Sequence, residues 1–307
     1  MMLNFKKISL DMKQIIDKYY FEYGEGSCQH SFVTNFCLKD KYDDMFCEYN
    51  SYLYVLRNGL EDENYRHYLL PMGDKEKDNI IKNAIDNIID DAKQYNKKVA
   101  FNSITEKSKN IISKFYKDRF VIEDSQDLYE YIYNIDDLAY LQGPKYHSKR
   151  NEVSLFFRKY KDDLCIKLIG DEDINNIKQL FNAWIEIDDK RNANPQLLFE
   201  NKELLIALEN YKELNLIGTV IYIQNDLAGF VIGTKLNNDY VDEMIEKGDI
   251  KYKGVYKVLN SEFPKMCMEQ NFKYVNFEED LGVEGLRNMK KLYHPSHYIK
   301  KFIAREV

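Results

Sequence analysis

The stretch Phe277-Glu-Glu-Asp-Leu-Gly-Val-Glu-Gly-Leu-Arg-Asn-Met-Lys-Lys-Leu-Tyr-His-Pro-Ser-His-Tyr298 lies close to the C-terminus of the chain. It starts where a strand predicted over residues 273–277 runs into three consecutive carboxylates, Glu278, Glu279 and Asp280. A glycine-rich turn and a short basic helix follow. An acidic cluster, a tight turn and a cationic cluster at the end of one strand are typical of the ligand-binding edge of an α/β sheet. The alternative interpretation is a solvated, capped helix after an edge strand.

The length and composition limit the class of protein. A chain of 307 residues predicts two domains, which we place at residues 1–140 and 141–307, joined around residues 135–150. The net charge of −7 argues against a protein that coats nucleic acid or anionic membrane, although it leaves room for a local basic pocket. No apolar run approaches the roughly 18 residues of a membrane span, and residues 1–11 lack the apolar core of a signal peptide. A cytoplasmic protein is therefore predicted.

The order of the predicted elements indicates an α/β layer fold. Isoleucine and alanine residues recur at helical spacing over residues 75–95, and strands at 99–101 and 120–122 flank a second helix near 106–116. In the second half, residues 216–224 and 228–235 predict a hairpin, and a helix that contains Pro264 runs from Gly254 to about residue 270. Alternating units of this kind are typical of layered α/β domains.

Three motifs follow one another in the second half of the chain. They are Leu138-Ala139-x-Leu141-x-Gly143-x-x-Tyr146-x-x-Lys149-Arg150-Asn151, then Lys253-Gly254-Val255-Tyr256-Lys257-Val258-Leu259-Asn260-Ser261-Glu262-Phe263, then Glu279-Asp280-x-Gly282-x-x-Gly285-Leu286-Arg287-x-x-Lys290-x-x-Tyr293-x-Pro295. Together they resemble the C-terminal domain of the bacterial phosphatidylglycerol lysyltransferase family. The resemblance implies two tandem GNAT-like acyltransferase domains, each with a mixed, mostly antiparallel sheet flanked by helices and related to Fem-type aminoacyl transferases.

The resemblance also implies a function. Family members of known activity transfer an aminoacyl group from a charged tRNA to an amine or to a lipid-headgroup hydroxyl. We therefore expect an acyl- or aminoacyl-transferase that uses aminoacyl-tRNA or another phosphate-bearing carrier, with a small-molecule, peptide or lipid-headgroup acceptor. The chain lacks the multi-pass membrane domain of the lipid-modifying members, which argues against phosphatidylglycerol itself as the acceptor. The alternatives are an acyl-CoA-dependent N-acyltransferase and a non-catalytic ligand-binding module on the same fold.

The candidate catalytic residues are Glu279, Asp280 and Tyr293. Acyl transfer requires a base for the incoming nucleophile and a donor for the developing oxyanion. We expect Glu279 or Asp280 to be the base, because the resemblance falls on these two carboxylates; a solvated acidic loop is the alternative. Tyr293 is either a general acid or a packing residue.

The candidate binding residues would contact phosphate or carboxylate groups. Arg287 and Lys290 share one face of the predicted basic helix, which suits an anion, although both would equally pair with Glu284 and cover the surface. Lys145, Lys149 and Arg150 would supply a second phosphate contact, or form an exposed basic face. The full set is Lys145, Lys149, Arg150, Asn151, Gly254, Gly282, Arg287 and Lys290. The sequence indicates no metal site, because His294 and His297 have no evident further ligands and the five cysteines form no Cys-x-x-Cys pair.

No resident cofactor is indicated, and acyl-CoA fits the sequence less well than aminoacyl-tRNA as the donor. A CoA-using enzyme should carry a Gln/Arg-x-x-Gly-x-Gly/Ala loop before its central helix, where backbone N–H groups hold the pyrophosphate. With Gly254 as the first glycine, Tyr256 occupies the last small position. With Gly254 as the second, Tyr252 and Asp249 occupy the other two required positions. Neither register fits.

Overall fold

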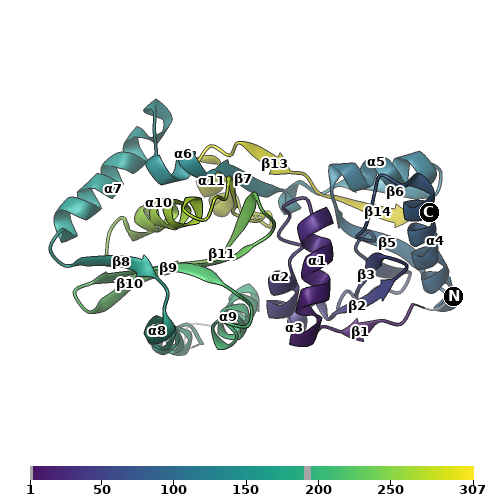
Figure 1. The fold of residues 1–307 in the computed structure, drawn as a ribbon, viewed down its shortest axis with the longest axis horizontal. Helices are drawn as coiled ribbons and strands as arrows, with labels where there is room; N and C mark the ends of the chain where they lie inside the picture. The colour runs from purple at the N-terminus through teal and green to yellow at the C-terminus, as the bar shows by residue number, and fades with distance from the viewer. Residues whose placement is uncertain (1–2, 190–194) are drawn as a thin grey trace. The chain divides into compact units, whose positions relative to one another are not determined.

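The computed structural model of the chain describes residues 3–189 and 195–307, with side chains described outside residues 182–201. The described residues form two seven-stranded mixed sheets flanked by helices (Figure 1). This confirms the predicted α/β class and its two mixed, mostly antiparallel sheets flanked by helices. Among the described helices, none has the length and apolar character that crossing a membrane requires.

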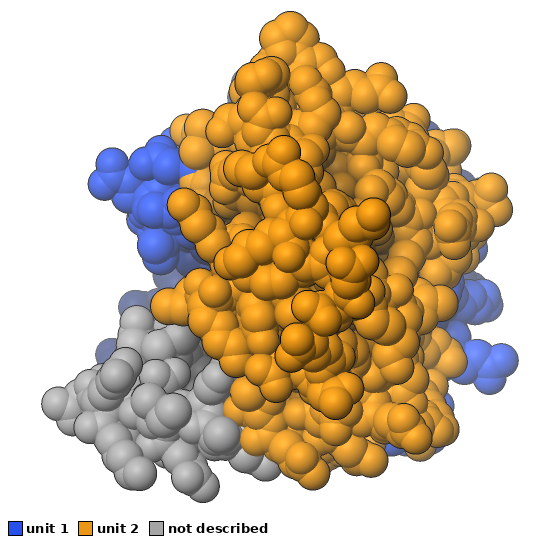
Figure 2. Space-filling view, turned by 90° about the vertical axis from the view of Figure 1, so that its left-hand side faces the viewer, with its two compact units in different colours: residues 1–131, 279–288, 298–307 blue, residues 132–278, 289–297 orange. Residues whose placement is uncertain are grey.

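The described chain divides into two compact units, which Figure 2 colours separately. Unit 1 comprises residues 1–131, 279–288 and 298–307, and unit 2 comprises residues 132–278 and 289–297. Neither unit is continuous in sequence. A single boundary after residue 140 would assign residues 279–288 and 298–307 to the second domain, whereas these residues belong to unit 1.

The first sheet has the order β1-β2-β3-β4-β5-β14-β6. Its neighbouring strands are antiparallel except β4 and β5, which are parallel and are connected through helix α4. Its C-terminal strand β14 lies between β5 and β6. The strands are β1 (Lys6–Lys7), β2 (Asp44–Tyr49), β3 (Tyr52–Arg57), β4 (Tyr65–Tyr68), β5 (Lys98–Ile104), β6 (Phe120–Asp124) and β14 (Phe302–Glu306). The helices are η1 (Leu10–Met12), α1 (Lys13–Tyr23), α2 (Phe32–Cys37), α3 (Lys39–Tyr42), α4 (Asp78–Gln94), α5 (Glu106–Phe115) and η2 (Gln126–Leu128).

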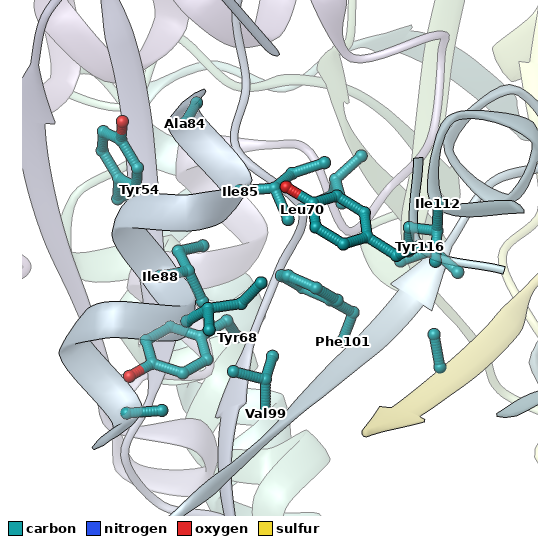
Figure 3. Packing of buried hydrophobic residues seen from close by; sticks show 14 of the residues in the cluster. Tyr54, Tyr68, Leu70, Ala84, Ile85, Ile88, Val99, Phe101, Ile112 and Tyr116 are labelled. Carbon is teal, nitrogen blue, oxygen red and sulfur yellow. The ribbon is translucent and has the colours of Figure 1, made fainter. Parts of the chain in front are cut away.

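The core of unit 1 forms where α4 packs on this sheet, and it confirms the helix predicted over residues 75–95. Ile81, Ile85 and Ile88 are fully buried on one face of α4 and belong to one cluster with Tyr68 and Phe101 of the sheet (Figure 3). Each buried isoleucine contributes about 2–3 kcal/mol of transfer free energy. The spacing of these isoleucines therefore determines both the helix and the face that it presents to the sheet.

The second sheet has the order β13-β7-β12-β11-β10-β9-β8, and the hairpin predicted at residues 216–235 is confirmed as β9–β10. Strands β11 and β12 are parallel and are connected through α10, which repeats the β4-α4-β5 arrangement of the first sheet. The strands are β7 (Glu130–Asn134), β8 (Leu164–Leu168), β9 (Ile217–Ile223), β10 (Asp226–Lys235), β11 (Tyr240–Gly248), β12 (Tyr274–Asn276) and β13 (His297–Ile299). The helices are α6 (Ile135–Tyr140), η3 (Pro144–Tyr146), α7 (His147–Tyr160), α8 (Asp171–Asp189), α9 (Pro195–Glu209), α10 (Val255–Met268) and α11 (Glu284–Lys291).

Two parts of the second half differ from the sequence prediction. The predicted connection around residues 135–150 is mostly helical, because α6, η3 and the first turn of α7 occupy it. Strand β11 was not predicted at all. It carries acidic residues in place of a regular alternation of apolar and polar residues, and it provides the side chains of the candidate site.

Candidate functional site

A β-bulge in β11 places two glutamates on one face of the second sheet. The register between β10 and β11 shifts between Ile232 and Gly233 of β10, because β11 carries an extra residue, Met244, at that point. Residues three apart in a regular strand point to opposite faces, whereas one inserted residue returns them to the same face. Glu243 and Glu246 therefore project from the same face of β11.

Helix α10 covers this face at close range. Gly248 of β11 lies against its first turn, and a Cβ atom there would come within 2.7 Å of Val255 Cγ1. Glycine is thus required for the approach of the helix. Further along α10, the Nδ2 group of Asn260 donates to Glu246 Oε1, and it also donates to the carbonyl oxygen of Tyr256 at 2.7 Å. The helix therefore fixes the position of Glu246.

The two glutamates have a raised affinity for protons. Burial raises the pKa of Glu243 to about 8, against the opposing charge of Lys290. Burial also raises the pKa of Glu246 well above its ordinary value, and the neighbouring charge of Glu243 adds to this, whereas Lys257 and Asn260 oppose it. Two carboxylates in one buried site do not both ionise readily. At neutral pH the pair therefore retains at least one proton.

Tyr293 lies in the same cluster, which we call the β11–α10 cluster (Glu243, Glu246, Lys257, Asn260 and Tyr293). Burial raises the pKa of Tyr293, and the charges of Glu246 and Glu243 raise it further. Its hydroxyl group and Glu243 Oε2 are both buried and have no hydrogen-bond partner among the described residues. A buried polar atom without a partner costs about 1–3 kcal/mol and calls for an explanation. A bound ligand that contacts both atoms would provide one.

Two lysines approach the ring of Tyr293. Lys149 Nζ lies 4.7 Å and Lys257 Nζ 6.0 Å from the ring centroid. Burial lowers the pKa of Lys149, and the charge of Lys257 lowers it further, whereas Glu152 opposes both effects. The cluster thus combines carboxyl groups that can exchange protons with ammonium groups that can stabilise a developing negative charge.

The residues predicted as a site divide between the two units. In unit 2, Tyr293 belongs to the β11–α10 cluster, Lys149 adjoins it, and Lys290 is buried and acts on Glu243 through its charge. Lys290 Nζ also donates to the carbonyl oxygen of Phe277 at 2.5 Å. Gly254 precedes the first residue of α10 with φ of +98°, the left-handed region that favours glycine.

The remaining candidates in unit 2 make local contacts. Lys145 forms an ion pair with Asp137 at 3.2 Å. The guanidinium group of Arg150 donates to the carbonyl oxygens of Leu141 and Gly143, at 2.5 and 3.2 Å. Asn151 is exposed, and its Nδ2 atom lies 3.4 Å from Nδ1 of His147. Lys145 and Arg150 therefore stabilise the turn between α6 and α7.

In unit 1, Asp280 is held in an ion pair. Its carboxylate accepts hydrogen bonds from Arg287 at 2.7 and 2.8 Å, from the Tyr131 hydroxyl at 2.5 Å, and from the N–H of Gly282 at 2.9 Å. Burial alone would raise its pKa, but these hydrogen bonds outweigh burial and lower the pKa to about 2. A carboxylate with so low a proton affinity is a poor base near neutral pH. Arg287 is likewise engaged, since it also contacts Asp127 at 2.6 Å.

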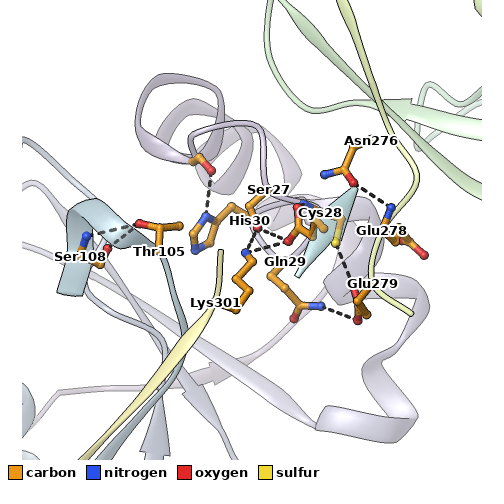
Figure 4. Close-up of polar contacts among 12 residues, drawn as sticks. Ser27, Cys28, Gln29, His30, Thr105, Ser108, Asn276, Glu278, Glu279 and Lys301 are labelled. Atoms are coloured by element: carbon orange, nitrogen blue, oxygen red, sulfur yellow. Dashed lines mark hydrogen bonds and ion pairs between the residues drawn. The ribbon is translucent and has the colours of Figure 1, made fainter. Parts of the chain in front are cut away.

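Glu279 lies beside the loop that follows α1. Its two carboxylate oxygens lie 3.5 Å from Cys28 Sγ and from Gln29 Nε2, and both of these groups belong to unit 1 (Figure 4). The contacts at residues 279–287 thus connect the acidic stretch and the basic helix to one another and to the remainder of unit 1.

We expect Arg287→Ala to lower the stability of unit 1 at pH 7, because it leaves the buried carboxylate of Asp280 without this cation. The low folded-state pKa of Asp280 contributes stability above its unfolded pKa of about 4, and this contribution is lost as the pH falls through about 2. Urea unfolding between pH 2 and 7 should therefore show a smaller pH dependence in the variant. Lys291→Ala, at an exposed position of the same helix, is the control. Unchanged stability of Arg287→Ala would contradict the structural role.

Glu243, Glu246 and Asn260 were not predicted as site residues. Asn260 occurs in the second of the three motifs, but nothing local distinguishes it from an ordinary polar residue of a helix. Glu243 and Glu246 are three apart, a spacing that places them on opposite faces unless the bulge is known. Among the described residues, no group of three or more His, Cys, Asp or Glu is arranged to hold a metal ion, and the five cysteines form no disulfide bond.

Comparisons with known proteins agree with this fold. An uncharacterised protein of Mycoplasmoides gallisepticum is 25% identical over 179 residues, which cover 58% of this chain and 56% of that protein, so the match spans little more than half of the relative. A conserved protein of unknown function from Bacteroides thetaiotaomicron has a crystal structure with a TM-score of 0.91 and 26% identity, and the match covers 100% of both chains. The structure of L-PGS from Bacillus licheniformis has a TM-score of 0.66 and 14% identity, with 95% of this chain and 91% of that chain covered.

The family comparison covers nearly the whole chain. The model described as "Phosphatidylglycerol lysyltransferase, C-terminal" matches residues 21–305, a range that includes all three motifs and the β11–α10 cluster. The chain therefore belongs to the phosphatidylglycerol lysyltransferase C-terminal family.

Proposed function

We propose that this protein is an acyl- or aminoacyl-transferase whose reacting centre is the β11–α10 cluster of unit 2. The observation that supports this most directly is the pair of buried, unpartnered polar atoms, Glu243 Oε2 and the Tyr293 hydroxyl, among the described residues. Active sites keep such atoms because the substrate supplies the missing partner. The raised pKa of Glu243, about 8, suits a residue that takes up a proton near neutral pH.

In this proposal each group has a defined role. Glu243 removes a proton from the incoming amine or hydroxyl group, and Tyr293 donates a hydrogen bond to the oxyanion that forms at the acyl carbon. The ammonium group of Lys149, beside the Tyr293 ring, stabilises the same negative charge. The base is therefore Glu243, in place of the sequence candidates Glu279 and Asp280.

The donor and acceptor are proposed from the family. Its description names a lysyltransferase, which supports an aminoacyl group as the unit transferred. We propose aminoacyl-tRNA as the carrier, as the resemblance of the three motifs implies. We propose an amine or hydroxyl group of a small molecule, a peptide or a lipid headgroup as the acceptor.

The test uses the whole chain and a bulk preparation of aminoacyl-tRNA. The wild type should accelerate loss of the aminoacyl ester when amine and hydroxyl acceptors are supplied, and charged tRNA should raise its melting temperature more than uncharged tRNA does. Acceleration with acetyl-CoA but not with charged tRNA would reassign the donor. No turnover with either donor would contradict the proposal.

Tyr293→Phe tests the site itself. We expect the rate to fall by about 10²-fold or more, because the oxyanion loses a donor. The stability of unit 2 should stay equal or rise by about 1 kcal/mol, because the hydroxyl makes no hydrogen bond among the described residues. Tyr140→Phe, at a position that is 49% exposed in the same unit, is the matched control. A Tyr293→Phe enzyme with full activity would exclude Tyr293 from the mechanism.

A further inference from the structure

The side-chain amide of Asn260 has only one possible orientation. Its Nδ2 atom lies 2.7 Å from the carbonyl oxygen of Tyr256, which can only accept a hydrogen bond, so the NH2 group must face that carbonyl. The same NH2 group donates its second hydrogen to Glu246 Oε1. Asn260 is 3% exposed, and its anchor is the backbone of its own helix. The donor is therefore fixed before any substrate binds.

The fixed donor determines which oxygen of Glu246 can carry a proton. Because Oε1 accepts from Asn260, a proton on Glu246 resides on Oε2. The bulge in β11 points Glu246 to the same side of the sheet as Glu243, whose Oε2 atom is a buried acceptor without a partner among the described residues. Protonated Glu246 is thus arranged as a hydrogen-bond donor, and Glu243 as a hydrogen-bond acceptor.

We propose that Glu246 is a second catalytic residue, a neutral carboxylic acid that gives its Oε2 proton to the leaving group, and that Asn260 is the positioning residue that orients the carboxyl group and leaves Oε2 as the oxygen that carries the proton. The inference rests on the transferase function proposed above and adds the acid to the base of that reaction. When two carboxyl groups in one site have different environments, their pKa values differ, and one can act as general acid while the other acts as general base.

The surroundings favour a pair that shares one proton. Burial and the charge of Glu243 keep Glu246 protonated. Lys257 on α10, the hydrogen bond from Asn260 and Lys247 on β11 favour its ionised form. The charge of Lys290, on α11, favours the ionised form of Glu243. Tyr293 and Cys267 also face the pair, and the carboxylates raise the pKa of both. The pair is therefore biased toward ionised Glu243 and neutral Glu246.

The protons balance over one turnover. The acceptor nitrogen or oxygen attacks the acyl carbon and loses its proton to Glu243, while the bond between the acyl carbon and the carrier oxygen breaks. That oxygen leaves with the proton from Glu246. The cycle ends with neutral Glu243 and ionised Glu246, and transfer of one proton from the first to the second restores the starting state. No oxidant, reductant or other co-reactant is needed.

The first test does not depend on turnover. Carboxyl ¹³C NMR titration of protein labelled at glutamate Cδ should resolve two glutamates that titrate as a coupled pair. Glu243→Gln should move the Glu246 titration to lower pH, because a like charge is removed. Asn260→Leu should move it to higher pH, because a donor to the ionised form is removed. Asn260→Ala serves if the leucine variant does not fold, and the exposed Glu269→Gln and Gln270→Leu at the end of α10 are the controls. A Glu246 titration that neither variant moves would overturn the proposal.

The second test compares leaving groups. Glu246→Gln keeps a neutral hydrogen-bond donor but has no proton to transfer. We expect the transfer rate from bulk aminoacyl-tRNA, whose alcohol leaving group must be protonated, to fall by about 10²-fold. The rate with 4-nitrophenyl acetate, whose leaving group departs as an anion, should fall far less. Equal losses with both donors would overturn the acid role. If neither donor is turned over by the wild type, the proposed function fails together with the acid role, whereas coupled titration would still establish the proton-sharing pair.

Discussion

Replacing Glu243 by glutamine is expected to abolish transfer and, at the same time, to stabilise unit 2. Glutamine keeps the size and one acceptor oxygen but cannot take up a proton, so the rate should fall by about 10²–10⁴-fold. The buried carboxyl group of Glu243 ionises less readily in the folded chain than in the unfolded chain. It therefore destabilises the folded state at any pH at which the unfolded chain ionises. Replacing the carboxyl group should therefore raise the free energy of unfolding of unit 2, because the group is retained for function and not for stability.

The pH dependence of this stabilisation has a definite sign. The pKa of Glu243 is raised from an unfolded value of about 4.5 to about 8 in the folded chain. The contribution of Glu243 to the free energy of unfolding is fully present below pH 4.5, where its carboxyl group is protonated in both the folded and the unfolded chain. This contribution is lost as the pH rises toward 8, because the carboxyl group ionises more readily in the unfolded chain. We expect Glu243→Gln to match the wild type at pH 4 and to exceed its stability by about 4 kcal/mol at pH 8.

The measurement is urea unfolding of both proteins between pH 4 and 8, with hydrogen exchange of the β11 amides to locate the effect in unit 2. The exposed Glu269→Gln at the end of α10 should show neither the loss of activity nor the pH-dependent gain. A Glu243→Gln variant that stays active would remove Glu243 from the mechanism. A variant that is inactive but less stable at pH 8 would point to structural damage instead.

Replacing Lys301 by methionine is expected to produce the largest loss of stability in unit 1. Lys301 Nζ lies 2.7 Å from Glu130 Oε1 and 2.5 Å from Ser27 Oγ, and the lysine and glutamate side chains are 1% and 0% exposed (Figure 4). Ser27 in turn donates to Glu130 at 2.7 Å, and the backbone N–H of Cys28 donates to its other oxygen. Breaking one half of a buried ion pair leaves a charge in a medium of low dielectric, so we expect a cost of about 3–5 kcal/mol.

The design of this test uses the neighbouring lysine as its control. Lys300 is about half exposed and lies 3.9 Å from Glu106, so Lys300→Met should cost less than about 0.5 kcal/mol. Unfolding in urea, with hydrogen exchange of the β14 amides, measures both variants. Adding Glu130→Gln to Lys301→Met should recover part of the loss, because the double variant buries no unpaired charge. Equal effects of the two lysine replacements would show that burial of the pair is unimportant.

Burial of histidine next to this ion pair adds a weaker pH effect. His30 lies beside the same pair, and its Nδ1 atom lies 2.9 Å from the carbonyl oxygen of Gly24. Burial lowers the pKa of His30 well below its ordinary value, and the charge of Lys301 lowers it further. The unfolded chain therefore takes up a proton below about pH 6.5 that the folded chain does not. Acid destabilisation of unit 1 should begin in this range.

Local sequence patterns were sufficient to predict those helices and strands whose apolar residues face a single core. The isoleucines of α4 recur every three or four positions, and this spacing alone predicts the helix and the face that packs against the sheet. The two apolar runs of β9 and β10 likewise predict a hairpin without knowledge of the remaining chain. The three motifs, read as a resemblance, indicated the family and placed Tyr293 and Lys149 among the candidates.

Only the tertiary structure decided which charged residues are available for chemistry. In the sequence, Glu279 and Asp280 look like candidate bases and Arg287 like an anion-binding residue. In the structure, Arg287 forms an ion pair with Asp280 at 2.7 Å, which holds both side chains. Glu243 and Glu246 look like surface residues, yet a single inserted residue in β11 turns both toward α10. The physical reason is that hydrophobic periodicity is a local property of the chain, whereas the pKa of a carboxyl group depends on burial and on charges that the sequence places far away.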